Sequence, residues 1–288
     1  MVTVMQAHIP VLATEVIDGL NLTAGKTIID GTLGLGGHAA LILDRTAPDG
    51  ILIGIDRDDR NLETAKHNLA KYGDRVQYVH SSFSTMNSLG VQVDVILLDL
   101  GFSSVHVDAA ERGFSFQNDG PLDMRYDTRE ELTAEAIVNS WSIDDLAALL
   151  RQLGEEPQAR KIANAIFAAR RAKRITSTVQ LADVVSAVVP RRGKTHPATK
   201  TFQALRLAVN DELGEVQRGL EAAQTVLKPG GILAVITFHS LEDRLVKHWL
   251  KDSEAFEVMS KKPIVPGRPE ILSNPRARSA KLRLARRK

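Results

Sequence analysis

The sequence predicts an α/β fold in which a parallel, doubly wound sheet is interrupted by an inserted all-helical domain. In the first third of the chain, short apolar runs alternate with helical patterns, which is typical of a parallel sheet. Strand character then stops, helical patterns take over, and strand character returns near the C-terminus. We therefore expect one α/β domain in two parts, 1–108 and 206–288, around a helical domain at 109–205.

The first part of the α/β domain contains four apolar runs with strand character. A helical pattern, NLETAKHNLAKYG at 61–73, separates the second run from the third. The expected strands are TIIDGTLG (27–34), ILIGIDRD (51–58), VQYVHSS (76–82) and VDVILLDLG (93–101).

The insertion is expected to be helical because its apolar residues recur at helical spacing. SIDDLAALLRQLG opens with a capping-box pattern, Ser142 to Asp145, and stops at Gly154. ARKIANAIFAARRAKR and VQLADVVSAVVP follow in the same style. After the insertion, LKPGG supplies a turn before the strand GGILAVITF, and weaker strand patterns are FEVMSKKPI (256–264) and KLRLARR (281–287).

The amino-acid composition excludes several classes of protein and of functional site. The 288 residues are 43% hydrophobic and 25% charged, an ordinary globular mixture. No apolar run approaches the roughly 18 residues that a membrane span requires, so we expect a cytoplasmic protein with no membrane partner. The chain has no cysteine, which excludes thiolate zinc sites, iron–sulfur clusters and cysteine nucleophiles.

Positive charge is unevenly distributed, although the net charge is only +2. Two clusters without an acid among them indicate a polyanionic partner, while solvated surface is the alternative for either cluster alone. The clusters are Arg170, Arg171, Lys173 and Arg174, and Arg276, Arg278, Lys281, Arg283, Arg286, Arg287 and Lys288.

A glycine-rich turn follows the first expected strand. In IIDGTLGLGGH, Asp30 ends the strand, and Gly34, Gly36 and Gly37 allow a sharp turn and close approach of a ligand to the backbone. Asp56 ends the next strand about twenty residues further on, where a carboxylate can accept the ribose hydroxyls of a nucleoside. Together these residues predict a nucleoside-binding crevice.

Two common phosphate-binding motifs are absent from this turn. Gly34 and Gly36 are not followed by the third glycine of G-x-G-x-x-G, which argues against a nicotinamide-dependent oxidoreductase. The P-loop is missing too, because Gly37 and His38 stand where Lys and Ser or Thr are required.

The acid-then-glycine turn, the acid ending the second strand, LLDLG and LKPGG together resemble the Rossmann-like class I S-adenosylmethionine-dependent methyltransferases. Asp99, at the end of the fourth strand, could polarise an exocyclic amine by accepting its N–H, or could hold the cofactor. Methylation at cytosine C5 usually needs a cysteine nucleophile, so an N- or O-methyl product is expected.

Across His8 to Arg283 the resemblance becomes specific to the bacterial 16S ribosomal RNA cytosine-N4 methyltransferases. It implies methyl transfer from S-adenosylmethionine to N4 of a cytosine, with S-adenosylhomocysteine as product. The blocks that carry it are HIPVL, DGTLGLGGH, DLGFSS, ERGFSFQNDGPLDMRYD, HPATKTFQALRLAVNDEL, FHSLEDR and NPRARSAKLR.

The resemblance implies a cofactor site and a catalytic residue, Asp99. Phe83 is expected against adenine, with a core position as the alternative. His106 stands where family members often have glutamine. The implied cofactor-binding residues are Gly36, Gly37, His38, Asp56, Phe83, Asp99 and His106.

RNA contacts are expected from the loop GFSFQNDGPLDMRYD at 113–127, where the aromatic rings of Phe114 and Phe116 could stack on an extruded cytosine. The alternative is a rigid hinge in which Asp123 and Arg125 pair with each other or with neighbours. The expected RNA-binding residues are Arg112, Asp123, Arg125, Lys200, Arg206, Asn210, His239, Asp243, Arg244 and Arg276.

No metal site is expected, because the eight histidines lack close ligand spacing. The expected partner is 16S ribosomal RNA within the small ribosomal subunit. The sequence leaves open which cytosine is methylated, whether an assembled subunit is needed and whether the chain forms a homodimer. A methyltransferase acting on another RNA atom and a non-catalytic RNA-binding assembly factor are the alternatives.

Overall fold

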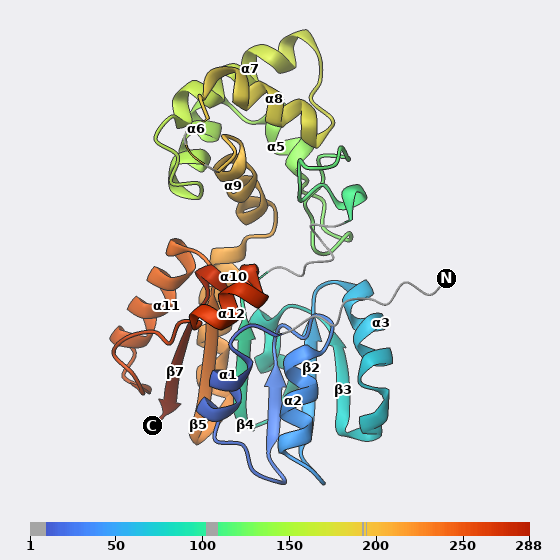
Figure 1. Ribbon diagram of the computed structural model, residues 1–288, viewed down its shortest axis with the longest axis vertical. Coiled ribbons are helices and arrows are strands. Elements are labelled where there is room, and N and C mark those ends of the chain that lie inside the picture. The colour runs from blue at the N-terminus through green and yellow to red at the C-terminus, as the bar shows by residue number, and fades with distance from the viewer. Residues whose placement is uncertain (1–9, 102–108, 192, 194) are drawn as a thin grey trace. The chain divides into compact units, whose positions relative to one another are not determined.

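The computed structural model describes residues 10–101, 109–191, 193 and 195–288 (Figure 1). The chain divides into two compact units. We call residues 1–101 with 213–288 the sheet unit, and residues 102–212 the helical unit. The boundaries expected at 108 and 205 both lie inside the helical unit.

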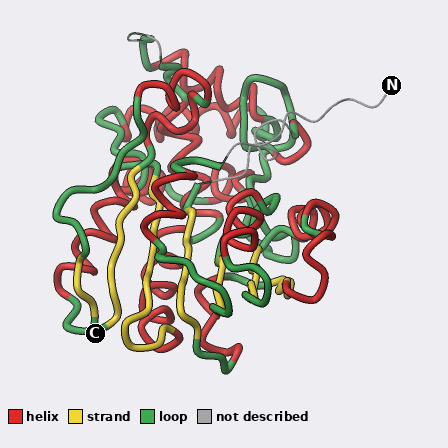
Figure 2. The backbone as a smooth tube through the Cα atoms, turned by 60° about the horizontal axis from the view of Figure 1, so that its bottom comes forward, coloured by secondary structure: helices red, strands yellow, loops and turns green. Residues whose placement is uncertain are grey.

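The sheet unit is built on a seven-stranded sheet with the order β3-β2-β1-β4-β5-β7-β6. The first five strands run parallel to one another, and β7 runs antiparallel to both of its neighbours. The strands lie side by side in Figure 2, where they are yellow. The strands are β1 (Thr27–Asp30), β2 (Ile51–Asp56), β3 (Val76–His80), β4 (Val93–Asp99), β5 (Leu227–Thr237), β6 (Phe256–Val258) and β7 (Lys281–Arg287). The expected α/β fold is therefore confirmed, and the strand order reverses between the neighbouring strands β1 and β4.

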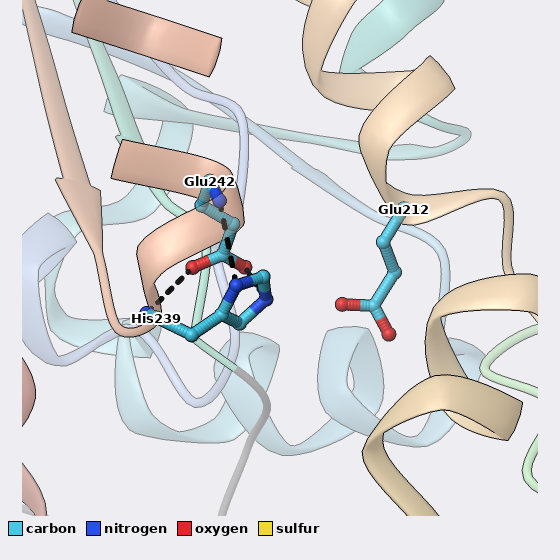
Figure 3. Close-up of side chains that lie close together, drawn as sticks. All are labelled: Glu212, His239 and Glu242. Carbon is cyan, nitrogen blue, oxygen red and sulfur yellow. Dashed lines mark hydrogen bonds and ion pairs between the residues drawn. The ribbon is translucent and has the colours of Figure 1, made fainter. Parts of the chain in front are cut away.

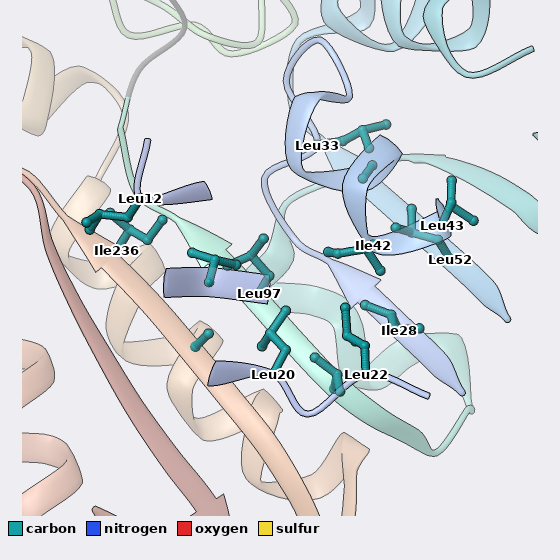
Figure 4. Packing of buried hydrophobic residues seen from close by; sticks show 14 of the residues in the cluster. Leu12, Leu20, Leu22, Ile28, Leu33, Ile42, Leu43, Leu52, Leu97 and Ile236 are labelled. Atoms are coloured by element: carbon teal, nitrogen blue, oxygen red, sulfur yellow. The ribbon is translucent and has the colours of Figure 1, made fainter. Parts of the chain in front are cut away.

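Successive residues of the parallel strands enter two different hydrophobic clusters, because side chains alternate between the faces of a sheet. Ile28 and Leu97 pack in one cluster (Figure 4) together with residues of α1 (Ala13–Gly19), α2 (Gly37–Arg45) and α3 (Asp59–Asn68). Ile29 and Leu98 pack in the other, together with residues of α10 (Glu212–Val226) and α11 (Ser240–Asp252). Both faces of the sheet are thus covered, which explains the continuous apolar runs in the sequence.

The helices of the sheet unit are short, and the helix expected at 61–73 is divided in two. α3 ends at Asn68, and a 3₁₀ helix, η1 (Ala70–Arg75), follows it. The remaining helices are α1 (Ala13–Gly19), α2 (Gly37–Arg45), α3 (Asp59–Asn68), η2 (Phe83–Leu89), α10 (Glu212–Val226), α11 (Ser240–Asp252), α12 (Arg268–Ser273) and η4 (Pro275–Ser279).

The LKPGG segment lies within the bounds of β5 and interrupts its pairing with β4. Leu227 pairs with Val93, and pairing resumes only at Ile232 with Val95. Gly230 adopts a φ of 79°, which favours glycine. The expected turn is therefore a bulge within the strand. The last strand matches its expected range, whereas β6 covers only the first three residues of 256–264.

The helical unit has its own hydrophobic core, as its apolar periodicity predicted. Ser142 caps α6 by accepting a hydrogen bond from the backbone N–H of Asp145 at 3.1 Å, which confirms the predicted helix start. Its helices are η3 (Ala110–Arg112), α5 (Ala134–Ser140), α6 (Ile143–Gln152), α7 (Ala159–Ala172), α8 (Thr178–Val188) and α9 (Thr199–Val209).

Among the described residues, we find no helix with the length and apolar character needed to cross a membrane.

A buried ion pair joins α11 to β7. Asp243 of α11 accepts hydrogen bonds from Arg283 Nε and Lys281 Nζ, both at 2.8 Å. The Arg283 side chain is only 8% exposed. Burial acts to raise the pKa of Asp243, but the hydrogen bonds from Lys281 and Arg283 outweigh it and hold this pKa below its ordinary value.

We predict that Asp243→Ala destabilises the sheet unit by about 3–5 kcal/mol, because it leaves the buried Arg283 guanidinium without its carboxylate. Urea unfolding followed by circular dichroism measures this change. Glu63→Ala is the matched control, since it removes a carboxylate from an exposed pair with Lys66, and we expect no change in its unfolding midpoint. Equal midpoints for Asp243→Ala and wild type would contradict the structural role.

Candidate active site

Three aspartates meet at the carboxyl ends of three adjacent parallel strands. Asp30 ends β1, Asp56 ends β2 and Asp99 ends β4. Asp30 follows the clustered residue Ile28 by two positions, and Asp99 follows Leu97 in the same way. By the alternation of a strand, the carboxylates lie on the face of the sheet that α2 covers. We call Asp30, Asp56 and Asp99 the carboxylate cluster.

The glycine turn leads from β1 into α2 and is held by its neighbours. Gly36 has a φ of 85°, which favours glycine, and a Cβ there would lie 2.9 Å from Leu69. The backbone N–H of Gly34 donates to Asp56 Oδ2 at 2.8 Å. Gly37 then begins α2. The hydrogen bond from Gly34 to Asp56 thus fixes the turn to the end of the second strand.

Asp56 is held by several donors. The backbone N–H of Asp58 donates to its Oδ1 at 2.8 Å, and the amide of buried Asn61 lies 3.3 Å from both carboxylate oxygens. These contacts fix the orientation of the carboxylate. A carboxylate held in one orientation is suited to accept hydrogen bonds from two ribose hydroxyls.

Asp30 is the most deeply buried member of the cluster, with 1% of its surface exposed. Burial raises its pKa to about 7, and the N–H of Thr32, which donates to Oδ1 at 3.2 Å, opposes this only in part. The charges of Asp99 and Asp56 raise the pKa further. The sequence showed an acid at this strand end but not the burial that makes it hold a proton near neutral pH.

Asp99 and His38 lie side by side at the same edge. The backbone N–H of Asp99 donates to Thr32 Oγ1 at 2.6 Å. Buried His38 lies with Nε2 2.9 Å from the carbonyl of Val11 and Nδ1 3.7 Å from Asp99 Oδ2. Because a carbonyl only accepts, Nε2 carries a hydrogen. His38 therefore joins the start of the described chain to the strand end that carries Asp99.

Phe83 packs in the core on the other face of the sheet. A Cβ on Gly219 of α10 would lie 2.4 Å from its ring, and Phe83 contacts the cluster that α10 and α11 complete. Its side chain is half-buried. The contact with adenine stays a prediction, and His106 lies outside the described residues.

The residues of FHSLEDR start α11 in the sheet unit. His239 is the N-cap, and Nδ1 accepts the backbone N–H of Glu242 at 3.4 Å while Glu242 accepts the backbone N–H of His239 at 3.3 Å (Figure 3). This reciprocal capping gives His239 a structural task. Asp243 pairs with β7, as described above, and Arg244 is exposed on the same helix. Arg276 is exposed in η4.

The loop at 113–127 belongs to the helical unit and satisfies its polar groups internally. Arg125 Nη2 donates to Asp123 Oδ2 at 2.7 Å, and its Nη1 donates to the carbonyl of Glu130 at 2.6 Å. Arg112 is buried and donates to the carbonyls of Arg125 and Tyr126 at 2.9 and 3.0 Å. Asp123 and Arg125 therefore pair with each other, which is the arrangement weighed as the alternative to RNA contact.

The aromatic rings of this loop are also engaged within the helical unit. Phe114 stacks on Tyr126 with ring centroids 5.2 Å apart, and Phe116 meets the edge of Phe202 at 4.8 Å. Both phenylalanines pack against the core of the unit. The stacking faces expected for a cytosine are thus partly covered by protein.

The three RNA-binding residues expected from HPATKTFQALRLAVNDEL differ in exposure and in hydrogen-bond partners. Lys200 is exposed, and its Nζ donates to the carbonyl of Glu155 at 2.8 Å. Arg206, with a side chain 12% exposed, pairs with Glu212 at 2.8 Å. Asn210, 4% exposed, accepts the N–H of Tyr126 at 2.8 Å and donates to the carbonyl of Met124 at 2.8 Å. RNA binding by these residues stays a prediction.

Comparison with known proteins adds independent findings. The model of the MraW methylase family matches residues 5–288. A "Ribosomal RNA small subunit methyltransferase H" from Cyanothece sp. is 50% identical over 97% of this chain and 94% of its own length. A protein of the same name from Symbiobacterium thermophilum is 46% identical over 96% and 95%.

A solved structure shares the fold at low identity. A candidate rRNA-methylase from Clostridium thermocellum superposes with a TM-score of 0.50 at 13% identity, covering 96% of this chain and 95% of that one. At this identity the likeness concerns the fold alone.

We predict that Asn210→Ala destabilises the helical unit by about 2 kcal/mol, because it leaves buried backbone groups of Met124 and Tyr126 without their partner. Thermal unfolding of the full chain measures this. Asn164→Ala, at an exposed position of α7, is the matched control and should leave the unfolding temperature unchanged. Weaker RNA binding at unchanged stability would instead assign Asn210 to the RNA.

Proposed function

Because the chain belongs to the MraW methylase family, we propose that it transfers a methyl group from S-adenosylmethionine to the exocyclic N4 of a cytosine in 16S ribosomal RNA. The observation that carries the proposal is the carboxylate cluster beside a glycine turn, at the point where the strand order reverses. The relatives named as small-subunit rRNA methyltransferases support the substrate class.

The residues at this edge fit S-adenosylmethionine by their charge and by the hydrogen bonds that their side chains can accept. S-adenosylmethionine, when bound, supplies a methyl group on a positively charged sulfonium. Asp56, fixed by Gly34 and Asp58, is placed to accept the ribose hydroxyls. The turn at Gly36 lets a ligand approach the backbone closely, and the carboxylate of Asp99 can offset positive charge.

Asp99 is the residue that we assign to the target amine. The lone pair of an aromatic amine is delocalised into the ring, so the nitrogen attacks weakly until an acceptor draws on its N–H. The carboxylate of Asp99 can accept that hydrogen bond, and 22% of its side chain is exposed, so it can be reached. When N4 bonds to the methyl carbon, the methyl–sulfur bond would break with its electron pair staying on sulfur, S-adenosylhomocysteine would leave, and the amine proton could pass to this carboxylate.

Phosphate contacts are proposed for the exposed face of α7 in the helical unit. This helix has no acidic residue. Arg170 is engaged with the carbonyls of Val138 and Trp141, both at 2.7 Å. Lys161 and Arg171 are exposed, and no ion pair of either is found among the described residues. These two cations suit a polyanionic backbone.

The setting of the reaction is part of the proposal. We place it in the cytoplasm, on RNA within the small ribosomal subunit. A homodimer stays a prediction, which sedimentation velocity would check.

The proposal is tested by incubating the protein with labelled S-adenosylmethionine and small subunits that lack the modification, followed by nucleoside analysis of the RNA. We expect label in N4-methylcytidine. Label in a different nucleoside would refute the target atom and keep the enzyme class, whereas tight RNA binding without any label would favour an assembly factor.

We predict that Asp99→Ala lowers kcat by roughly 10²-fold or more, because the amine loses its acceptor. Asp99→Asn keeps an acceptor oxygen but not the charge, so its kcat should lie between that of the wild type and that of Asp99→Ala. Single-turnover methylation at saturating cofactor measures these rates, and Glu63→Ala on the exposed face of α3 is the control. A normal kcat with a raised KM for S-adenosylmethionine would assign Asp99 to the cofactor alone.

We predict that Arg171→Ala weakens RNA binding and lowers the slope of log K against log salt by about 1, because one phosphate contact is lost. Lys161→Ala should act in the same way. Filter binding over a salt series measures the slope. Asn164→Ala on the same helix is the uncharged control. An unchanged slope for both charge variants would remove α7 from the RNA surface.

A further inference from the structure

Asp30 is a buried ionisable group with no role in the reaction as proposed so far. It is 1% exposed, and its only hydrogen bond among the described residues comes from the backbone N–H of Thr32. No cation pairs with it in the part of the chain that the structure describes. A carboxylate in such a place is costly to ionise, since burial removes its hydration and no positive charge replaces it.

The neighbours of Asp30 add to this cost. Asp56 stands at the end of β2 on one side and Asp99 at the end of β4 on the other, and both charges act against ionisation of Asp30. The carboxylate oxygens of Asp56 accept the backbone N–H groups of Gly34 and Asp58. The titratable group facing Asp99 from α2 is His38, at 3.7 Å. Asp30 therefore lies between two acidic neighbours, and among the described residues no cation pairs with it.

The proposed cofactor carries positive charge, which could act as the partner of the Asp30 carboxylate. S-adenosylmethionine has a sulfonium and an ammonium group, and either of them beside the carboxylate cluster would favour the ionised form of Asp30. We infer that Asp30 holds a proton in the free protein and releases it when S-adenosylmethionine binds. This inference rests on the proposed cofactor site and gives Asp30 a positioning role, that of a counter-charge formed only in the complex.

The sign of the resulting pH dependence follows from linkage. Binding that releases a proton is favoured by low proton concentration, so affinity rises with pH while free Asp30 is still protonated. Since burial raises the pKa of free Asp30 to about 7, we expect the rise below about pH 7, down to the lower pKa that Asp30 has in the complex. The Kd should fall by at most about tenfold per pH unit and level off above that range.

The experiment is calorimetric titration of the full chain with S-adenosylmethionine in two buffers of different ionisation enthalpy. The difference in heat gives the number of protons released, and we expect a substantial fraction of one proton near neutral pH. The neutral 5′-methylthioadenosine is the matched ligand, because it keeps the nucleoside and the sulfur but has neither positive charge. We expect it to release no proton.

Two variants assign the proton to its group. Asp30→Asn should abolish proton release and flatten the pH dependence of Kd. His38→Gln keeps a hydrogen-bond donor towards Val11 but removes the neighbouring titratable group, and proton release should persist. Where Asp30→Asn does not fold, infrared difference spectra of the wild type decide: the C=O band of a buried protonated carboxyl should disappear on addition of S-adenosylmethionine.

The outcomes separate this inference from the function on which it rests. Absence of S-adenosylmethionine binding would overturn the cofactor site and this inference together. Binding with equal heats in both buffers and no change in the carboxyl band would overturn the role of Asp30 and leave the cofactor site standing. Loss of proton release in His38→Gln, with the carboxyl band unchanged in the wild type, would move the proton to His38.

Discussion

The parallel pairing of β1 with β2 on one side and β4 on the other is the constraint on which the site depends. Asp30 lies in register with Gly54 and with Leu97, so the two neighbouring strands each run two residues further, to Asp56 and Asp99. A shift of one residue in either ladder would turn that carboxylate to the opposite face. The apolar alternation that places Ile28 and Ile29 in different clusters therefore also sets which face the acids occupy.

The same arrangement works against the stability of the free protein. The pKa of Asp30 is raised above the 3.8 of an ordinary aspartate, so the folded state binds more protons than the unfolded state up to about pH 7, and stability falls as pH rises through that window. Asp243 behaves in the opposite sense: its pKa is lowered by Lys281 and Arg283, so its contribution is present above the unfolded value and is lost in acid. One carboxylate supports the fold, while the other is retained at a cost to it, which is common at functional sites.

Much of this could be read from the sequence, because the signals were local. Apolar runs ending in Asp30, Asp56 and Asp99 gave the strands, and Ser142 gave the start of α6. What could not be read depends on long-range contacts. The partner of Asp243 lies 40 residues away in Arg283, and Asn210 meets Tyr126 at a separation of 84 residues. The residue types of Asp243 and Asn210 indicated that both side chains form hydrogen bonds. They did not indicate that Arg283 and Tyr126 of the same chain are among their partners.

The loop at 113–127 illustrates the same limit and carries its own consequence. Its charges and rings matched what a cytosine-binding loop would need, yet Arg125 is engaged with Asp123 and with the carbonyl of Glu130, and Phe116 with Phe202. Side chains held in this way lose little conformational entropy when a ligand arrives, whereas free chains must be ordered first. The loop is thus better suited to act as a rigid, preorganised surface than as a set of mobile donors. On the proposed function, the affinity for RNA would come mainly from exposed cations such as Lys161 and Arg171, and the selection of the RNA target from the fixed shape of the loop.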